Sequence, residues 1–292
     1  MTEQFISTHV TLSTLNELDV LRISNQSATA TVALQGAHLI EFTPSGGNNC
    51  LFVSSAEHFE TGKAIRGGIP ICWPWFGDHP SNESAPAHGF ARTSLWQYEV
   101  ITDSDRRTDL KFWLETTGSN EHFPCQARAE LLISVGETLV MSLTTMNQGN
   151  VPFLLSQALH SYFPCQEISE VQLHGLQGAF YNNKLNGENA NFPSDFRFDR
   201  EIDWLLLEPG KPVGFTGLGQ PNLKLTRMGS RSLVVWNPWI EKAKTLSQFH
   251  PEEYRRMFCV ETTNVSEDSR LVKPGQSHVM MMELSWETSV IQ

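Results

Sequence analysis

Residues 65–92 contain side chains that could bind a small anion. Arg66 precedes a pair of glycines, and His88 and Arg92 follow a short polar loop. Two guanidinium groups suit an anion such as phosphate, because each can donate paired, charge-assisted hydrogen bonds. Tryptophan and phenylalanine side chains in the same stretch could form the wall of a cleft around that ligand. The alternative is a buried aromatic cluster whose arginines extend their charged ends to water.

Three other side chains could transfer protons or bind hydroxyl groups. His160 lies in an otherwise apolar stretch, Glu261 ends the apolar run 257–260, and Asp203 alternates with apolar residues. A histidine of pKa near 6.5 can gain and lose a proton at neutral pH, and partial burial would raise the pKa of a glutamate towards that range. The alternatives are a hydrogen-bonded core histidine, a glutamate at a wet strand end and a solvated acidic strand face.

These residues lie in motifs that resemble those of a known enzyme family. IRGGIPICWPWFG followed by HGFAR is similar to the signature of the hexose-6-phosphate mutarotases (glucose-6-phosphate 1-epimerases), a branch of the galactose-mutarotase-like superfamily. The resemblance extends to LHSYF, WNPW and CVET, so it covers nearly the whole chain. It implies an isomerase without a cofactor, which interconverts the α and β anomers of glucose 6-phosphate or a similar aldohexose phosphate.

The resemblance also implies a role for each matching residue. His160 corresponds to a general acid and Glu261 to a general base in opening and closing the sugar ring. The substrate-binding residues that we expect on the same grounds are Arg66, His88, Arg92 and Asp203. Arg66 and Arg92 correspond to phosphate contacts, and Trp73, Trp75 or Trp239 could stack on the sugar.

Two positions depart from the family pattern. Trp204 stands where a basic residue usually follows the sugar-binding aspartate, so Asp199 is an alternative to Asp203. Ala87 stands where a glutamine often contacts the substrate. Both departures could alter substrate preference.

The elements that must position these residues are short strands. Apolar runs alternate with turn residues about every 8–12 positions, which is typical of a β-sandwich or barrel. Hairpins are predicted over 95–116 and 127–146, and 152–164 reads as one strand with His160 on a face with Tyr162. The one helical stretch is 241–249. Composition does not separate a sandwich from a jelly roll, whereas the resemblance implies an all-β, large antiparallel sandwich forming a single domain over residues 1–292.

Composition and charge favour some binding partners and cellular locations over others. The net charge of −11 argues against nucleic acid, but one sugar phosphate needs only a few local cations. No apolar run reaches the ~18 residues of a membrane span, and the N-terminus lacks a signal-peptide pattern. Five scattered cysteines and histidines without metal-ligand spacing predict neither disulfides nor a metal site. We therefore expect a cytoplasmic enzyme, monomeric or weakly oligomeric, whose partner is a small sugar phosphate.

Three other functions fit parts of the sequence. A mutarotase for free aldoses would leave Arg66 and Arg92 as structural residues. A non-catalytic sugar-phosphate-binding protein could use the same scaffold, and so could a sandwich that serves only protein–protein contacts. The preferred hexose is left open.

Overall fold

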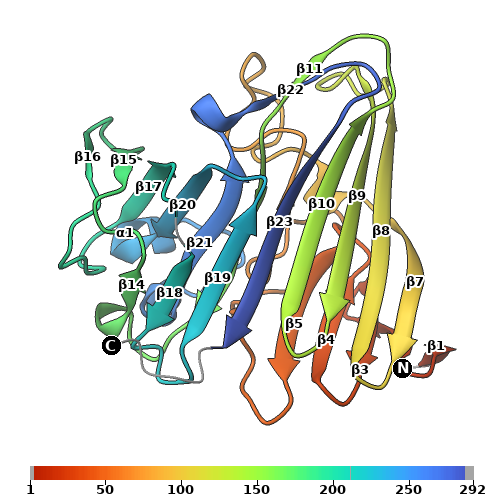
Figure 1. The fold of residues 1–292 in the computed structure, drawn as a ribbon, viewed down its shortest axis with the longest axis horizontal. Coiled ribbons are helices and arrows are strands. Elements are labelled where there is room, and N and C mark those ends of the chain that lie inside the picture. The colour runs from red at the N-terminus through yellow and green to blue at the C-terminus, as the bar shows by residue number, and fades with distance from the viewer. Residues whose placement is uncertain (1–2, 211, 287–292) are drawn as a thin grey trace.

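The computed structural model describes residues 3–210 and 212–286, which form antiparallel sheets with little helix (Figure 1). One eight-stranded sheet has the order β14 (Gln172–His174), β18 (Val213–Thr216), β19 (Leu223–Met228), β23 (Ser277–Trp286), β10 (Leu139–Asn147), β9 (Gln126–Val135), β8 (Arg107–Thr117), β7 (Gln97–Ser104). Behind one half of it lies a five-stranded sheet of β1 (Gln4–Ser7), β2 (Val10–Leu15), β3 (Leu18–Ser24), β4 (Ala28–Ala33), β5 (His38–Pro44).

A second eight-stranded sheet, called the site sheet below, lies beside the other half (Figure 1). Its order is β16 (Asn189–Asn191), β15 (Phe180–Asn183), β17 (Ile202–Leu207), β20 (Ser232–Asn237), β21 (Met257–Asn264), β12 (Gln157–Leu159), β6 (Ile71–Cys72), with β13 (Tyr162–Pro164) also paired to β21. A small ribbon joins β11 (Phe153–Leu155) to β22 (Arg270–Val272). The helices are short: α1 (Trp239–Ala243) and the 3₁₀ turns Ala91–Thr93, Ile168–Glu170, Pro251–Arg256, Ser266–Asp268.

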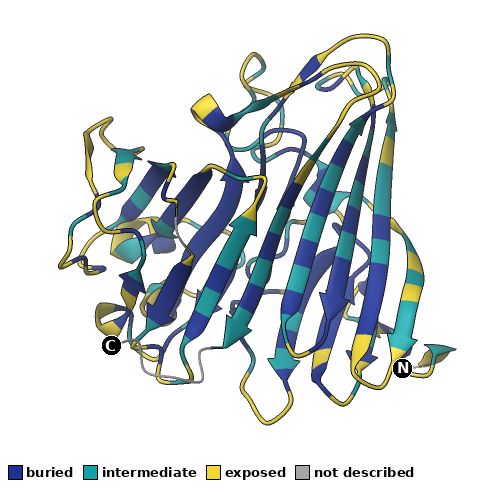
Figure 2. Cartoon of the chain, in the orientation of Figure 1, coloured by how far each residue is buried: buried dark blue, intermediate teal, exposed yellow. Residues whose placement is uncertain are grey.

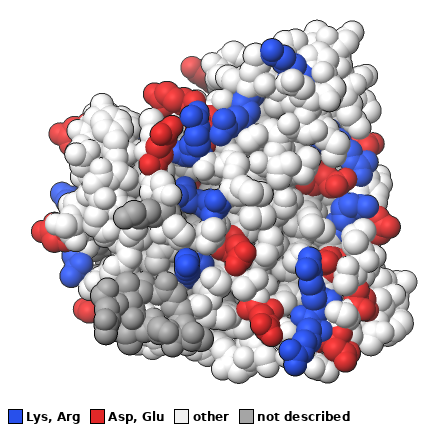
Figure 3. Space-filling view, in the orientation of Figure 1, with Lys and Arg blue, Asp and Glu red and all other residues white. Residues whose placement is uncertain are grey.

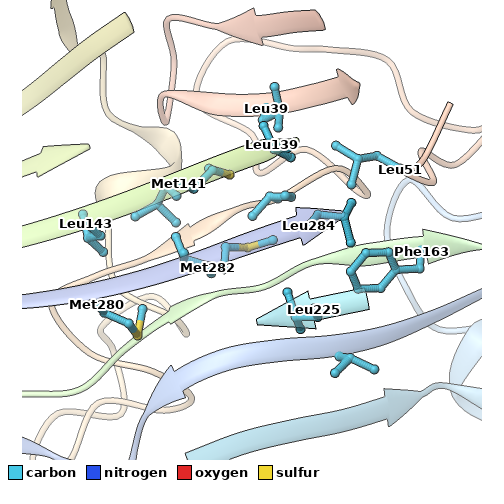
Figure 4. Close-up of a cluster of buried hydrophobic side chains, with 14 of the residues drawn as sticks. Leu39, Leu51, Leu139, Met141, Leu143, Phe163, Leu225, Met280, Met282 and Leu284 are labelled. Atoms are coloured by element: carbon cyan, nitrogen blue, oxygen red, sulfur yellow. The ribbon is translucent and has the colours of Figure 1, made fainter. Parts of the chain in front are cut away.

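Alternating side chains join the sheets into one core. Burial alternates along β9, β10 and β23 with the period of two expected for strands that have one apolar face (Figure 2). Side chains from β5, β10, β13, β19 and β23 meet between the sheets (Figure 4). Together they form a sandwich core, because each sheet must cover its apolar face with another layer.

Several predictions about elements are confirmed, and two are wrong. The hairpins β7–β8 and β9–β10 have the predicted pairing, and the all-β sandwich class is confirmed. The stretch 152–164 is not one strand, because the chain breaks into β11, β12 and β13, with His160 between the last two. The helix predicted over 241–249 is wrong in both bounds, because α1 begins at Trp239 and ends at Ala243. At its start, the backbone N–H of Trp239 donates to the side-chain oxygen of Asn237.

Charged side chains of both signs are interspersed on the face shown in Figure 3. Among the described residues, no helix is both long enough and apolar enough to span a bilayer. That the protein does not bind nucleic acid stays a prediction.

Candidate active site

A cavity of about 660 Å³ lies against the site sheet and takes in most of the predicted site residues. Its polar lining includes Arg66, His88, His160, Asp203 and Glu261. It falls within the ~300–1,000 Å³ range of small-molecule sites and brings together residues that are distant in the sequence. The structure therefore brings these five predicted site residues to one cavity, while their roles stay predictions.

Strand register explains why these side chains share a face of the site sheet. Leu159 pairs with Thr262 and Tyr162 pairs with Cys259, so His160 stands opposite Glu261 in the same register. Continuing across β20 and β17, one row of neighbouring positions is His160, Glu261, Val234, Leu205. The next row, two residues along each strand, is Tyr162, Cys259, Trp236, Asp203. Of these eight residues only Cys259 is not a lining residue.

The His160–Glu261 pair is almost completely buried. Nδ1 of His160 lies 3.5 Å from Oε1 of Glu261. Only 8% of the surface of His160 and 1% of that of Glu261 is exposed to solvent. Burial lowers the pKa of His160 well below its usual value, and the positive charges of Arg92 and Arg66 lower it further. Burial raises the pKa of Glu261 well above its usual value, and the nearby Asp203 adds to this effect. Both shifts favour the uncharged form of the side chain. The pKa of His160 is therefore not the unperturbed value near 6.5 that the sequence analysis assumed.

The glycine pair fixes the backbone that carries Arg66. Gly67 and Gly68 have φ of 134° and 62°, and a Cβ on either would collide with a neighbouring backbone carbonyl. The carboxylate of Glu57 accepts the Arg66 N–H at 2.6 Å, and Nε2 of His38 lies 2.7 Å from the Gly67 carbonyl oxygen. This buried scaffold leaves the guanidinium of Arg66 at the cavity wall.

His88 is held in one tautomer by its own loop. The N–H of Gly77 donates to Nδ1 of His88 at 3.2 Å, and the N–H of His88 donates to the Gly77 carbonyl at 2.7 Å. Because Nδ1 accepts a hydrogen bond, the proton of the neutral ring is on Nε2. Burial and the charges of Arg92 and Arg66 lower the pKa of His88 to about 3. His88 therefore offers the cavity a neutral N–H donor.

Arg92 lies behind the cavity wall and is not among the lining residues, contrary to the prediction. Its Nη2 donates to the carbonyl of Ala87 at 2.7 Å, and Ala87 itself lines the cavity. The charge of Arg92 nevertheless lowers the pKa of both His88 and His160. Arg92 therefore acts on the site through its charge and through its hydrogen bond to Ala87.

Asp203, and not Asp199, reaches the cavity. Asp199 is exposed and pairs with Arg200 at 3.2 Å. Trp204 faces the other side of β17, where it stacks on Tyr181 with ring centroids 4.0 Å apart. Strand alternation thus directs residue 204 away from the cavity, so the departure at this position removes no group from the cavity wall.

Comparison with known proteins identifies the family. The family model described as aldose 1-epimerase matches residues 19–285. The chain belongs to the aldose 1-epimerase family. A relative from Escherichia coli (strain K12), named "Putative glucose-6-phosphate 1-epimerase", is 30% identical over 270 residues, covering 91% of this chain and 90% of its own. A relative of the same name from Cenchrus ciliaris is 33% identical over 270 residues, covering 85% of this chain and 78% of its own.

Solved structures agree with this assignment. A crystal structure titled as a "putative mutarotase (YeaD)" from Salmonella typhimurium superposes with a TM-score of 0.89 at 26% identity, covering 97% of this chain and 95% of that one. The structure titled HI1317 superposes with a TM-score of 0.82 at 28% identity, covering 98% and 99%. The fold is that of the galactose-mutarotase-like proteins, and the chain is an epimerase of the isomerase class.

This epimerase has cavity residues that sequence reasoning missed. Trp236, Lys184 and Lys242 line the cavity. The predicted stacking residues Trp73 and Trp75 are instead buried in the core, where their indole N–H groups donate to Thr145 and Pro86. The alternation along β20 could have indicated Trp236, whereas no local pattern marks the two lysines.

One group of side chains has the composition of a metal site. The donor atoms of His160, Cys259 and Glu261 all lie within 4.8 Å of one another, and all three residues are buried. An imidazole, a thiolate and a carboxylate are ligands that Zn²⁺ accepts. Two of the three are the proposed proton carriers, and the absence of a functional metal stays a prediction.

Proposed function

We propose that the epimerase interconverts the α and β anomers of glucose 6-phosphate or a similar aldohexose phosphate. The observation that carries this proposal is the buried His160–Glu261 pair in a cavity whose wall includes Arg66. A carboxyl and an imidazole can move the two protons that ring opening requires, and a guanidinium fits a phosphate. The names of the E. coli and Cenchrus ciliaris relatives support the same substrate class.

The reaction needs one base and one acid on the reacting edge of the sugar. Glu261, as carboxylate, takes the proton from the C1 hydroxyl, while protonated His160 gives a proton to the ring oxygen as the C1–O5 bond breaks. The open aldehyde rotates about C1–C2. The ring then closes on the other face, with Glu261 returning its proton to the C1 oxygen and His160 recovering one from the C5 hydroxyl.

The active pair carries one proton in total. A protonated Glu261 beside a neutral His160 has the same proton count as a carboxylate beside an imidazolium, and burial favours the first form in the unliganded enzyme. A bound phosphate dianion would offset the positive charges of Arg66 and Arg92 that oppose protonation of His160. Substrate binding would thereby favour the form that can react.

The test is anomer exchange followed by NMR. Glucose 6-phosphate, galactose 6-phosphate and mannose 6-phosphate are compared with the corresponding free sugars, after subtraction of the spontaneous rate. Faster exchange of a phosphorylated hexose supports the proposal. Equal or faster exchange of a free sugar would make this a free-aldose mutarotase, and no exchange of any hexose phosphate would indicate a binding protein.

A further inference from the structure

Two lysines on the cavity wall have no part in the acid–base step. Lys184 lies in the turn between β15 and β16, and Lys242 lies in α1. Both are exposed, and the described residues contain ion pairs of Lys111 and Lys244 but none of these two lysines. Their ammonium groups are therefore available to a ligand.

The backbone of each lysine is fixed, although its side chain extends into solvent. The N–H of Lys184 donates to the carbonyl of Asp203 at 2.8 Å, which ties the turn to the strand that carries the predicted sugar-binding carboxylate. The carbonyl of Lys242 accepts from the N–H of Thr245 at 3.0 Å and from its hydroxyl at 2.9 Å. Anchored main chains hold both positive charges near the cavity at little cost in backbone entropy.

The charges of these lysines affect the pKa of a carboxyl group on the cavity wall. Burial raises the pKa of Asp203, while the charges of Lys184 and Lys242 both act in the opposite direction. Lys184 also acts on the exposed Glu267. The two ammonium groups are thus close enough to influence an anion that binds beside Asp203.

The protein needs such local cations if its substrate is a dianion. Its net charge is −11, and the cavity wall also includes the acidic residues Asp78, Asp203 and Glu261. Among the residues that the structure describes, Arg66 is the one arginine on that wall. At physiological salt a charge acts over ~8 Å, so cations at the wall can attract a phosphate that the whole molecule would repel.

We infer that Lys184 and Lys242 determine specificity for phosphorylated aldoses by attracting the phosphate dianion to the cavity and strengthening its binding there. This inference rests on the proposed function and extends it. The lysines do not contact the reacting atoms, so their effect falls on KM and on salt dependence more than on kcat.

The test uses Lys184→Gln, Lys242→Gln and the double variant in the full-length protein. Lys244→Gln is the matched control, because Lys244 is also exposed but pairs with Glu241 at 2.7 Å and does not line the cavity. We expect the ratio of kcat/KM for glucose 6-phosphate to kcat/KM for glucose to fall about threefold per lysine and about tenfold in the double variant. The salt dependence of kcat/KM for glucose 6-phosphate should weaken in parallel.

Binding of glucose 6-phosphate, measured by calorimetry at two ionic strengths, separates this inference from the proposed function. If the wild type shows no anomer exchange, the proposed function fails, and weaker phosphate-ester binding by the lysine variants would still support the inference. An unchanged ratio and unchanged affinity in the double variant would overturn it. An equal loss in Lys244→Gln would overturn it too, since the effect would then be one of general surface charge.

Discussion

Nδ1 of His160 lies 3.5 Å from Oε1 of Glu261, because His160 lies between β12 and β13, which both pair with β21 in a register that sets it opposite Glu261. The same register holds on both sides of the break between β12 and β13, so the break does not shift the pairing. Side chains directly opposite each other on one sheet face have Cβ atoms about 4.5–5.5 Å apart. The proposed acid and base are therefore held together by paired strands, with a separation set by strand spacing.

Replacing either member of this pair should abolish most of the exchange activity. Glu261→Gln keeps the shape but cannot accept the C1 proton, and His160→Asn removes the exchangeable ring proton. Each variant should lose about 10²–10⁴-fold in the enzyme-catalysed rate of anomer exchange. Binding of glucose 6-phosphate, measured by calorimetry, should persist in both.

Spontaneous anomerisation sets the background in this experiment. It must be measured in the same buffer at each pH, because buffers also catalyse the reaction. Exchange by both variants at the wild-type rate above that background would refute the assignment of acid and base. Circular dichroism spectra that match the wild type would exclude loss of the fold as the cause.

The protonation of His160 should respond to phosphate. Burial and the positive charges of Arg92 and Arg66 lower its pKa, so we expect the ring of the unliganded enzyme to stay neutral as the pH falls below 6.5. A bound dianion stabilises the imidazolium and should raise the pKa of His160 towards its ordinary value. NMR titration of the labelled histidines with and without glucose 6-phosphate measures this change, with His160→Asn to assign the signal. A pKa unaffected by the ligand would contradict it.

Arg66 should matter more for the phosphorylated sugar than for the free one. Arg66→Ala removes a guanidinium from the cavity wall, and loss of one charge-assisted contact costs about 1.5–3 kcal/mol, or a tenfold to hundredfold change in affinity. Arg92→Ala should have a smaller effect in the same direction, because Arg92 acts from behind Ala87. The measurement is kcat/KM for glucose 6-phosphate and for glucose. Equal losses on both substrates would show that these arginines support the fold instead.

The sequence allowed the site to be predicted where chemistry and local pattern coincide. Resemblance to the mutarotase motifs indicated Glu261 and Asp203, whereas strand alternation alone left a wet strand end and a solvated acidic face as alternatives. The glycines after Arg66 indicated a constrained backbone. The position of Arg92 could not be predicted, because its hydrogen bond to Ala87 depends on the path of a polar loop. Lys184 and Lys242 were missed because a turn and a five-residue helix bring them to the cavity through tertiary packing.

The tryptophans also show that local sequence pattern does not identify which side chains line the cavity. An aromatic residue next to a binding motif looks like a ligand contact, yet Trp73 is fully buried, with its indole N–H donating to Thr145 at 3.0 Å. Trp236 lines the cavity instead, since β20 pairs directly with β21. Strand alternation groups the residues that share a face, but the packing of the whole sheet decides which face meets the cavity.

The buried histidines that support the site should make the protein sensitive to acid. Burial lowers the pKa of His38 to about 4, while in the unfolded chain it returns to about 6.5. Below pH 6.5 the unfolded state therefore binds more protons than the folded state, so the free energy of unfolding falls as the pH falls towards 4. By pH 4.5 His38 alone should cost roughly 2–3 kcal/mol of stability relative to pH 7.5.

His38→Gln tests this without removing the donor to the Gly67 carbonyl, because a glutamine amide can also donate there. Urea unfolding at pH 7.5, 5.5 and 4.5 should show a smaller loss of stability with acid in His38→Gln than in the wild type. His58→Gln, at a solvent-exposed position, controls for the loss of an imidazole in general. If His38→Gln and the wild type lose stability equally between pH 7.5 and 4.5, His38 does not hold a neutral ring in the fold, and the support ascribed to it beneath Arg66 must come from other groups.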